Sequence, residues 1–247
     1  MTHGCQFVRR YWMHSLPRKH FLIAVLTGVL LGSVLLLTKV AHTQSQANKK
    51  SQEPDPTTTA VRNGGLREAA KLKRVYVSSE RTSGWAKYDL EGLTSASSAI
   101  IIGTPLSSSS RLSASGDRVI TEHEIKIERV VKGNLKPSES ISLVVPGGKV
   151  TFEDGSSAEI RTLDLGPIAE QKRYVFFLRS SEDKVDAFSL IGGGQGAFEL
   201  PAPDANVRPL GARTDIVQKH KNQKVSAFVE EVEKAAKEHP ETSSCCQ

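Results

Sequence analysis

An uncharged apolar run covers residues 21–37, beginning at Phe21 and ending at Leu37. It follows four basic residues: Arg9, Arg10, Arg18 and Lys19. The run is near the short end of the roughly 17 to 25 residues with which a helix spans a bilayer. Basic residues before a span favour a cytoplasmic N-terminus. The sequence therefore predicts a transmembrane helix over residues 21–38 that binds the membrane and places the rest of the chain outside the cytoplasm.

The residues after the apolar run distinguish a permanent anchor from a cleaved leader. A secretory leader ends in small residues around its cleavage site, whereas Lys39 and His42 occupy that region here. The run is also longer than the roughly 7 to 15 apolar residues of an ordinary leader. A single-pass signal anchor in the cytoplasmic membrane is therefore favoured, and secretion after leader cleavage is the alternative.

Gly28 and Gly32 have the spacing G-x-x-x-G within this run. In a spanning helix, that spacing lets two backbones approach closely and favours dimerisation. Small residues are common in single spans without any such role. A weak homodimer through Gly28 and Gly32 is therefore a hypothesis, and the spacing without dimerisation is the favoured interpretation.

Composition divides the remainder of the chain. Residues 1–20 form a basic tail that the topology places in the cytoplasm. Residues 39–80 contain much Gln, Ser, Lys, Pro and Thr and little that could form a core, which predicts a disordered linker. Residues 81–240 are long enough for one domain with its own hydrophobic core. This domain is predicted to be β-rich and extracytoplasmic, and residues 241–247 are predicted to be a flexible tail.

Cysteine and charge exclude several classes of protein. The cysteines are Cys5, Cys245 and Cys246, so the predicted domain contains none and no disulfide framework holds it. The vicinal pair at the C-terminus could form an intermolecular disulfide, although a frayed tail is the favoured interpretation. The net charge of +6 is spread along the chain. A nucleic-acid site would gather Lys and Arg with aromatic residues on one face, so no nucleic-acid partner is expected.

Strand patterns dominate the predicted domain. Residues 119–131 alternate, which places Val119, Thr121, His123 and Ile125 on one face and most charges on the other. Continuous apolar runs at 99–104 and 173–178 predict buried strands. Further strands are predicted at 140–145, 150–153, 157–160, 187–191 and 197–200. Residues 105–117 are rich in Ser and Gly and predict a loop, and Asp154-Gly155 predicts a type I′ hairpin turn.

Two helical segments flank these strands. Residues 88–98 begin with acidic residues and predict a short helix, and an apolar stripe predicts an amphipathic helix near the C-terminus. Its members are Val225, Phe228, Val229, Val232, Ala235 and Ala236. The predicted fold class is therefore α+β: an N-terminal transmembrane helix, then a small antiparallel β-barrel or sandwich, OB-like, with a C-terminal amphipathic helix.

The motifs AIIIGTP, RVVKG, SLVVPGG, RYVFFL and IGGGQGAFEL follow one another over residues 88–237. This combination resembles uncharacterised bacterial membrane-anchored or exported β-domain proteins. More distantly, it resembles the netrin and tissue-metalloproteinase-inhibitor family, whose fold is an OB-like barrel. The resemblance implies a fold rather than an activity. Inhibitors of that family chelate zinc through an N-terminal cysteine, and no cysteine lies near the start of this domain.

The residues that could carry chemistry form no recognised pattern. Glu122-His123-Glu124 looks like a metal site, but alternation along a strand places His123 on the opposite face from both glutamates. The glycine-rich run 192–196 could approach an anion, although a tight turn between strands is favoured. No catalytic, cofactor-binding or metal-binding residue is therefore assigned, and no cofactor is expected.

Two functions are compatible with this sequence. The favoured one is a membrane-tethered, non-enzymatic binding module that recognises an extracytoplasmic protein or envelope ligand. The alternative is an extracytoplasmic hydrolase with a dispersed acid/base site, such as His123 with Asp117 or Glu124.

Overall fold

The computed structural model of the 247-residue chain describes residues 55–80, 86–181, 186–211 and 214–240. The chain divides into two units, Met1–Lys50 and Ser51–Gln247, and every described residue belongs to the second. The elements are, in chain order, α1 (Pro56–Lys73), β1 (Val75–Glu80), α2 (Leu90–Ala96), β2 (Ala99–Leu112), β3 (Val119–Lys132), β4 (Ser140–Pro146), β5 (Gly148–Thr151), β6 (Ser157–Thr162), β7 (Tyr174–Ser180), β8 (Ala187–Leu190), the 3-10 helix η1 (Gly193–Gly196), β9 (Ala197–Glu199), β10 (Arg208–Pro209), α3 (Asp215–His220) and α4 (Val225–Glu238).

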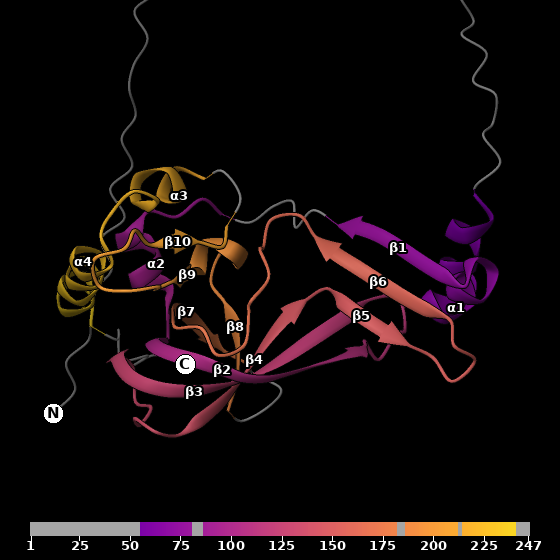
Figure 1. Ribbon diagram of the computed structural model, residues 1–247, viewed down its shortest axis with the longest axis horizontal. Helices are drawn as coiled ribbons and strands as arrows, with labels where there is room; N and C mark the ends of the chain where they lie inside the picture. Colours follow the sequence, from indigo (N-terminus) through magenta and orange to yellow (C-terminus); the bar gives the residue numbers. More distant parts are fainter. Residues whose placement is uncertain (1–54, 81–85, 182–185, 212–213, 241–247) are drawn as a thin grey trace, which may run out of the picture. The chain divides into compact units, whose positions relative to one another are not determined.

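Five of the strands close into a barrel. β2, β3, β4 and β8 are hydrogen-bonded in that order, and β7 pairs with both β2 and β8, which completes the ring. The pairing of β4 with β8 is parallel and the other pairings in the ring are antiparallel. β9 and β10 continue the sheet from β7 (Figure 1). The described fold is thus a sheet-rich domain with few helices.

The first part of β2 and most of β7 are buried on both faces, as their continuous apolar sequences predicted. Ile101 and Phe176 belong to the apolar cluster inside the barrel. Ile100 and Phe177 alternate with them and belong to a second cluster on the outside. Both faces of these strands contact an apolar cluster, so a strand that is apolar on one face only would bury polar side chains here. The position of the strands between two clusters therefore requires unbroken apolar runs.

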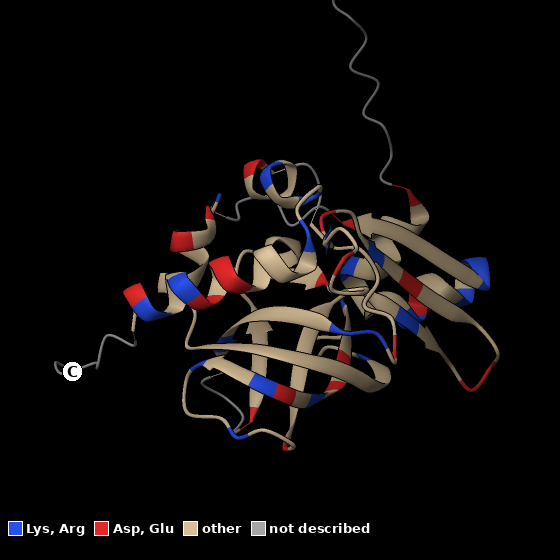
Figure 2. Cartoon of the chain, turned by 60° about the vertical axis from the view of Figure 1, so that its left-hand side comes forward, with Lys and Arg blue, Asp and Glu red and all other residues tan. Residues whose placement is uncertain are grey.

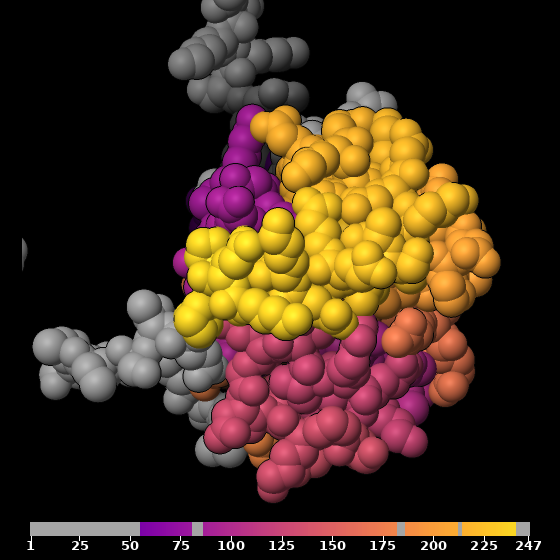
Figure 3. All heavy atoms as spheres, turned by 90° about the vertical axis from the view of Figure 1, so that its left-hand side faces the viewer, coloured from indigo at the N-terminus to yellow at the C-terminus, as the bar shows by residue number. Residues whose placement is uncertain are grey.

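Helices α2 and α4 cover the outer cluster. The apolar stripe of α4 is buried there, with Phe228 and Val232 fully enclosed, so the predicted C-terminal helix is confirmed. In the space-filling view, α4 in yellow lies against the part of the chain that contains β3 (Figure 3). An ion pair of 2.6 Å between Arg129 on β3 and Glu233 on α4 joins these two elements. The exposed side of α4 carries alternating anions and cations (Figure 2).

A second, three-stranded sheet has the order β1-β6-β5, with β1 and β6 parallel. It packs with α1 around a third apolar cluster that includes Leu66, Phe152 and Ile160. The far end of the β2–β3 hairpin contributes Val119 and Leu112 to the same cluster. The hairpin is therefore shared: one end is part of the barrel and the other end packs against the small sheet (Figure 1).

No helix in the described ranges is sufficiently long and apolar for a membrane crossing. The longest, α1, spans 18 residues with a kink at Gly65 and carries several cationic side chains together with Glu68. The predicted fold class is corrected accordingly, because it began with a transmembrane helix and the described fold contains none. Residues 21–38, where that helix and the single-pass signal anchor were predicted, lie outside the described residues. The Gly28–Gly32 spacing and the three cysteines lie outside them as well.

Residues 39–80, which composition predicted as a disordered linker, contain two elements, α1 and β1. α1 begins at Pro56 after Asp55, whose side chain accepts a hydrogen bond of 3.1 Å from the backbone N–H of Thr57. An acidic cap followed by proline at the first helical position is a typical helix start. The helix is stabilised by packing of Leu66 and Ala70 against the small sheet, which composition alone does not predict.

Two local predictions were wrong. β2 does not end before the predicted loop at 105–117 but continues to Leu112, and residues 107–112 pair with β3. The turn at Asp154-Gly155 joins β5 to β6 as a hairpin, but only Gly155 has positive φ, at 76°. A type I′ turn needs positive φ at both central residues. The connection is instead a longer loop, closed by a 2.8 Å bond from Phe152 N–H to the carbonyl of Ser156.

Candidate functional site

A groove of about 590 Å³ lies where the barrel meets the small sheet. Its walls come from the ends of β2, β3 and β4, from β6, and from the segment after β6. The apolar lining residues are Val145, Pro146, Ile160, Leu165, Pro167 and Ile168, and the polar ones are Ser110, Thr121, His123, Arg161 and Thr162, with Gly147, Gly148 and Gly166 between them. The groove is thus mainly apolar, with a few polar side chains contributed by β2, β3 and β6.

His123 is the buried titratable side chain of this groove. It projects from β3, between Ser108 on β2 and Leu143 on β4, and only 6% of it is exposed. Its Nδ1 atom is buried and has no hydrogen-bond partner among the described residues. A buried polar atom without a partner costs stability, commonly about 1–3 kcal/mol. Such an atom beside a groove is a group that a bound ligand or water can satisfy.

Alternation along β3 separates His123 from its neighbouring glutamates, as predicted. Thr121 and His123 line the groove, whereas Glu122 and Glu124 line a different hollow, among serines of β2 and β4. Glu122 accepts a hydrogen bond of 2.5 Å from Ser142. The three residues 122–124 therefore cannot act on one ligand.

The environment of His123 keeps its imidazole neutral near neutral pH. Burial lowers the pKa of His123, and the nearby carboxylate of Glu170 opposes this effect only in part. Glu170 is itself held by a hydrogen bond of 2.9 Å from the Ser108 hydroxyl. A neutral imidazole has one donor and one acceptor nitrogen, so His123 is suited to a ligand that offers a polar group without a full positive charge.

The floor of the groove is fixed by hydrogen bonds to backbone. Thr121 donates to the carbonyl of Gly147 at 2.6 Å, and Thr162 donates to the carbonyl of Pro146 at 2.9 Å. Gly148 has φ of 123°, and a Cβ atom at this position would collide with Ser110 and Thr121. Glycine is required here because the chain turns sharply from the barrel into the small sheet.

The residues proposed for a hydrolase are not brought together. Asp117 lies in the turn between β2 and β3, where it accepts hydrogen bonds from Ser113, at 3.0 Å, and from Ser115. Glu124 lies on the opposite face of β3 from His123. Sequence analysis missed Glu170, because nothing in the segment after β6 indicates that it would approach β3. Within the described residues, no cluster of three or more His, Cys, Asp or Glu side chains could hold a metal ion.

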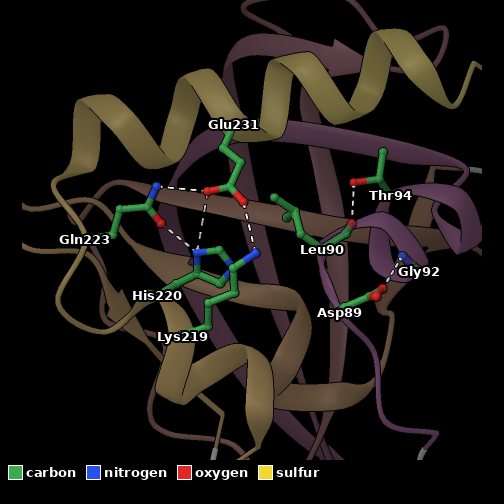
Figure 4. A network of polar contacts seen from close by, with 8 residues as sticks. All are labelled: Asp89, Leu90, Gly92, Thr94, Lys219, His220, Gln223 and Glu231. Carbon is green, nitrogen blue, oxygen red and sulfur yellow. Dashed lines mark hydrogen bonds and ion pairs between the residues drawn. The ribbon is translucent and has the colours of Figure 1, made fainter.

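A second histidine, His220, is buried by packing against aromatic side chains. It is completely buried between the rings of Phe198 and Phe228, with ring centroids at 6.5 and 5.2 Å. Its Nδ1 lies 2.6 Å from Gln223 Oε1, and Gln223 donates to Glu231 at 2.9 Å (Figure 4). Burial raises the pKa of Glu231, but hydrogen bonds from Gln223 and Lys219 outweigh this effect and lower it. This network joins α3 to α4.

The glycine-rich run after β8 is a packed turn. Its residues form η1, and all four members of η1 are buried. Gln195 accepts a hydrogen bond of 3.2 Å from Tyr88 N–H and donates to the carbonyl of Ala86 at 3.0 Å. The run therefore connects two strands and holds the segment before α2, which agrees with the favoured interpretation of residues 192–196.

The groove around His123 is accordingly the site that the geometry favours. Comparison with known proteins gives no match for this chain, either to a protein-family model or to a curated protein.

Proposed function

We propose that the chain is a non-enzymatic binding module and that the groove around His123 is its ligand site. One observation carries the proposal: a buried imidazole with an unpartnered Nδ1 atom lines a groove whose other walls are largely apolar. Ligand sites in proteins are typically concave and apolar, with a few polar groups that fix the orientation of the ligand. A ligand with an apolar part and one hydrogen-bonding group fits this lining.

The rigidity of the groove also supports binding. His123 and Thr121 belong to a strand that is paired on both sides, and Gly148 lies in a sterically fixed turn. Side chains held by regular structure need little ordering when a ligand arrives, so less of the binding free energy is lost.

The relationship to netrin-like and metalloproteinase-inhibitor-like barrels is part of the same proposal. The ring of β2, β3, β4, β8 and β7 supports it, since the OB fold is also a five-stranded barrel. The extracytoplasmic location expected from residues 21–37 concerns residues outside the described ranges and stays a prediction.

The binding proposal is tested by titrating the ¹⁵N-labelled chain with a library of small aromatic and aliphatic amides and carboxylates. We expect amide shift changes to gather on Thr121, Gly148 and Thr162. His123→Phe removes the imidazole and Ile168→Trp fills the groove, so each weakens the best binder by about tenfold or more, as expected for the loss of one good contact. Glu124→Gln, on the opposite face of β3, is the matched control and binds like the wild type.

Two results would overturn the proposal. Shift changes that gather elsewhere, or binding that is equal in His123→Phe and the wild type, would remove the groove as the site. Hydrolysis of ester or peptide probes that disappears in His123→Phe would replace the binding module by the hydrolase alternative.

A further inference from the structure

The exposed apolar side chains of the described residues gather in one region. The large hydrophobic residues that are exposed there are Leu72 (61%), Val75 (54%), Val77 (46%) and Leu163 (52%). Val75 and Val77 lie on β1, Leu72 lies in the last turn of the helix before it, and Leu163 directly follows β6. Scattered exposed apolar residues need no explanation, but a group on one sheet indicates an interaction surface.

The register of the small sheet places three of these side chains on one face. β1 and β6 pair in parallel with Val75 opposite Ser157 and Val77 opposite Glu159. Leu163 continues this register by a hydrogen bond of 2.9 Å from its N–H to the carbonyl of Glu80. Residues 75, 77 and 163 therefore point to the same outer side, because side chains alternate along each strand.

β1 is also the long open edge of the described fold. It is the end strand of its sheet, and Figure 1 shows it on the side of β6 away from β5. β10, the end strand of the larger sheet, has only two residues and includes Pro209, and both features disfavour pairing with a further strand. β1 has six residues, no proline and no lysine. Such an edge is suited to pairing with another strand.

Only every second residue of β1 directs its backbone N–H and C=O groups toward the open edge. The carbonyls of Arg74 and Glu80 both accept hydrogen bonds from the β6 side, at Ser157 and Leu163. In a parallel ladder every second residue directs its N–H and C=O at a given neighbour. The even-numbered residues thus face β6, and the N–H and C=O groups of residues 75, 77 and 79 face outward.

These groups allow a self-complementary pairing. If two copies of β1 meet antiparallel around Val77, then Val77 pairs with Val77 and Val75 pairs with Ser79, all through outward-facing backbone groups. The same register brings Arg74 of each copy, the residue between α1 and β1 with φ of 56°, next to Glu80 of the other, within reach of its long side chain. Both side chains are exposed, and neither has an ion-pair partner among the described residues. Opposite charges directly across an antiparallel pair stabilise it.

We propose that β1 is a homodimer interface at which two small sheets join edge to edge about a two-fold axis at Val77. The joined sheet has six strands and carries Val75, Val77 and Leu163 of both copies along one face. Twofold interfaces use the same patch on both partners, which the charge pairing between Arg74 and Glu80 provides. A single strand pair buries less surface than a stable complex needs, so the association is weak and concentration-dependent.

Sedimentation equilibrium of the full-length chain in a density-matched mild detergent tests this interface. We expect the average mass to rise with concentration from 26.9 kDa toward twice that value. Arg74→Glu and Glu80→Arg each place like charges opposite one another twice, and each raises the dissociation constant about tenfold or more. The double variant restores the opposite charges and dimerises within about threefold of the wild type. Lys149→Glu, on the far strand β5, is the matched control and leaves association unchanged.

Cross-linking tests the register without relying on charge. In a chain whose three cysteines are replaced by serine, Val77→Cys forms a covalent dimer on oxidation, because the two copies of this residue pair directly. Thr151→Cys, at an exposed position on the outer face of β5, remains monomeric. Circular dichroism verifies that both variants are folded.

Three outcomes overturn the interface. The first is a mass that stays at 26.9 kDa at all concentrations. The second is cross-linking that is no greater at residue 77 than at residue 151. The third is association that survives charge reversal and is lost in a Gly28→Leu, Gly32→Leu variant, which would assign dimerisation to the apolar run instead.

Discussion

At the scale of single residues, His123 links the barrel to the proposed site. Its imidazole is buried, its Nδ1 atom has no partner among the described residues, and its neighbours on the same face line a groove. A phenylalanine of similar shape would pack well at this position without an unsatisfied nitrogen. The unpartnered nitrogen of His123 has a cost to stability that a ligand or water bound in the groove would offset.

The stability of the fold should depend on the protonation of His123. Burial lowers the pKa of His123 in the folded chain, whereas in the unfolded chain the imidazole has its ordinary pKa of about 6.5. The unfolded chain binds more protons as the pH falls through this value, so the free energy of unfolding decreases. The contribution of the neutral His123 imidazole to the free energy of unfolding is therefore complete above about pH 6.5 and decreases as the pH falls below this value.

Urea unfolding at pH 8 and pH 5.5 measures this effect. We expect the loss of stability between the two pH values to be smaller in His123→Phe than in the wild type, because the variant lacks the titrating group. Thr121→Val changes the same wall of the groove but keeps His123, so it should retain the wild-type dependence on pH. An identical dependence in His123→Phe and the wild type would contradict the role of burial.

At the scale of elements, α4 depends on its buried face. Phe228 is fully buried, with its ring centroid 4.8 Å from that of Phe198, and it fills the space between the helix and the barrel. Phe228→Ala should lower the free energy of unfolding by about 3–5 kcal/mol, because it leaves a cavity in a packed core. Lys234→Ala on the exposed side of the same helix should change it by less than about 0.5 kcal/mol. Chemical denaturation measures both, and equal effects would contradict this account of the helix.

The elements that sequence analysis predicted correctly are those with a strong apolar pattern. α4 has a helical stripe, β3 alternates, and the first residues of β2 and most of β7 are continuously apolar because both faces are buried. The second half of β2 gave no such pattern. Its serines pair with the part of β3 that also pairs with β4, and most of them are exposed, so hydrogen bonds to β3 define the strand while burial does not.

The site was predictable only in part. Alternation along β3 correctly separated His123 from Glu122 and Glu124, because that relation is local. The groove itself was not predictable, since its walls come from strands far apart in the sequence. The segment that contributes Leu165 and Ile168 has no pattern that indicates its position. Its placement depends on tertiary packing against the barrel core.

At the scale of the whole folded unit, the shared β2–β3 hairpin couples the two sheets. Val119 packs with Leu66 beside the small sheet, while Ile125 and Ile127 of the same strand pack inside the barrel. The small sheet has no strand pairs with the hairpin but packs against its far end, so separating the two would expose the apolar cluster that they share. The barrel and the small sheet should therefore unfold in one cooperative transition.

A pair of variants tests this coupling. Leu66→Ala removes a side chain that is 1% exposed in the cluster beside the small sheet. It should move the single unfolding transition to lower denaturant by about 2–5 kcal/mol, with the same slope. Leu72→Ala, on the same helix and 61% exposed, should have almost no effect. A separate early transition in Leu66→Ala would show that the small sheet unfolds alone.

The parallel pairing of β1 with β6 has a consequence for biosynthesis. The ribosome completes β1 before any of β2 to β5 exists, and its partner β6 follows only after them. During that interval the edge of β1 that pairs with β6 is also unpaired, and nascent strands with unpaired edges are prone to wrong associations. A newly made chain thus exposes an unpaired, association-prone strand until translation reaches residue 162. Protection by chaperones matters most during this interval.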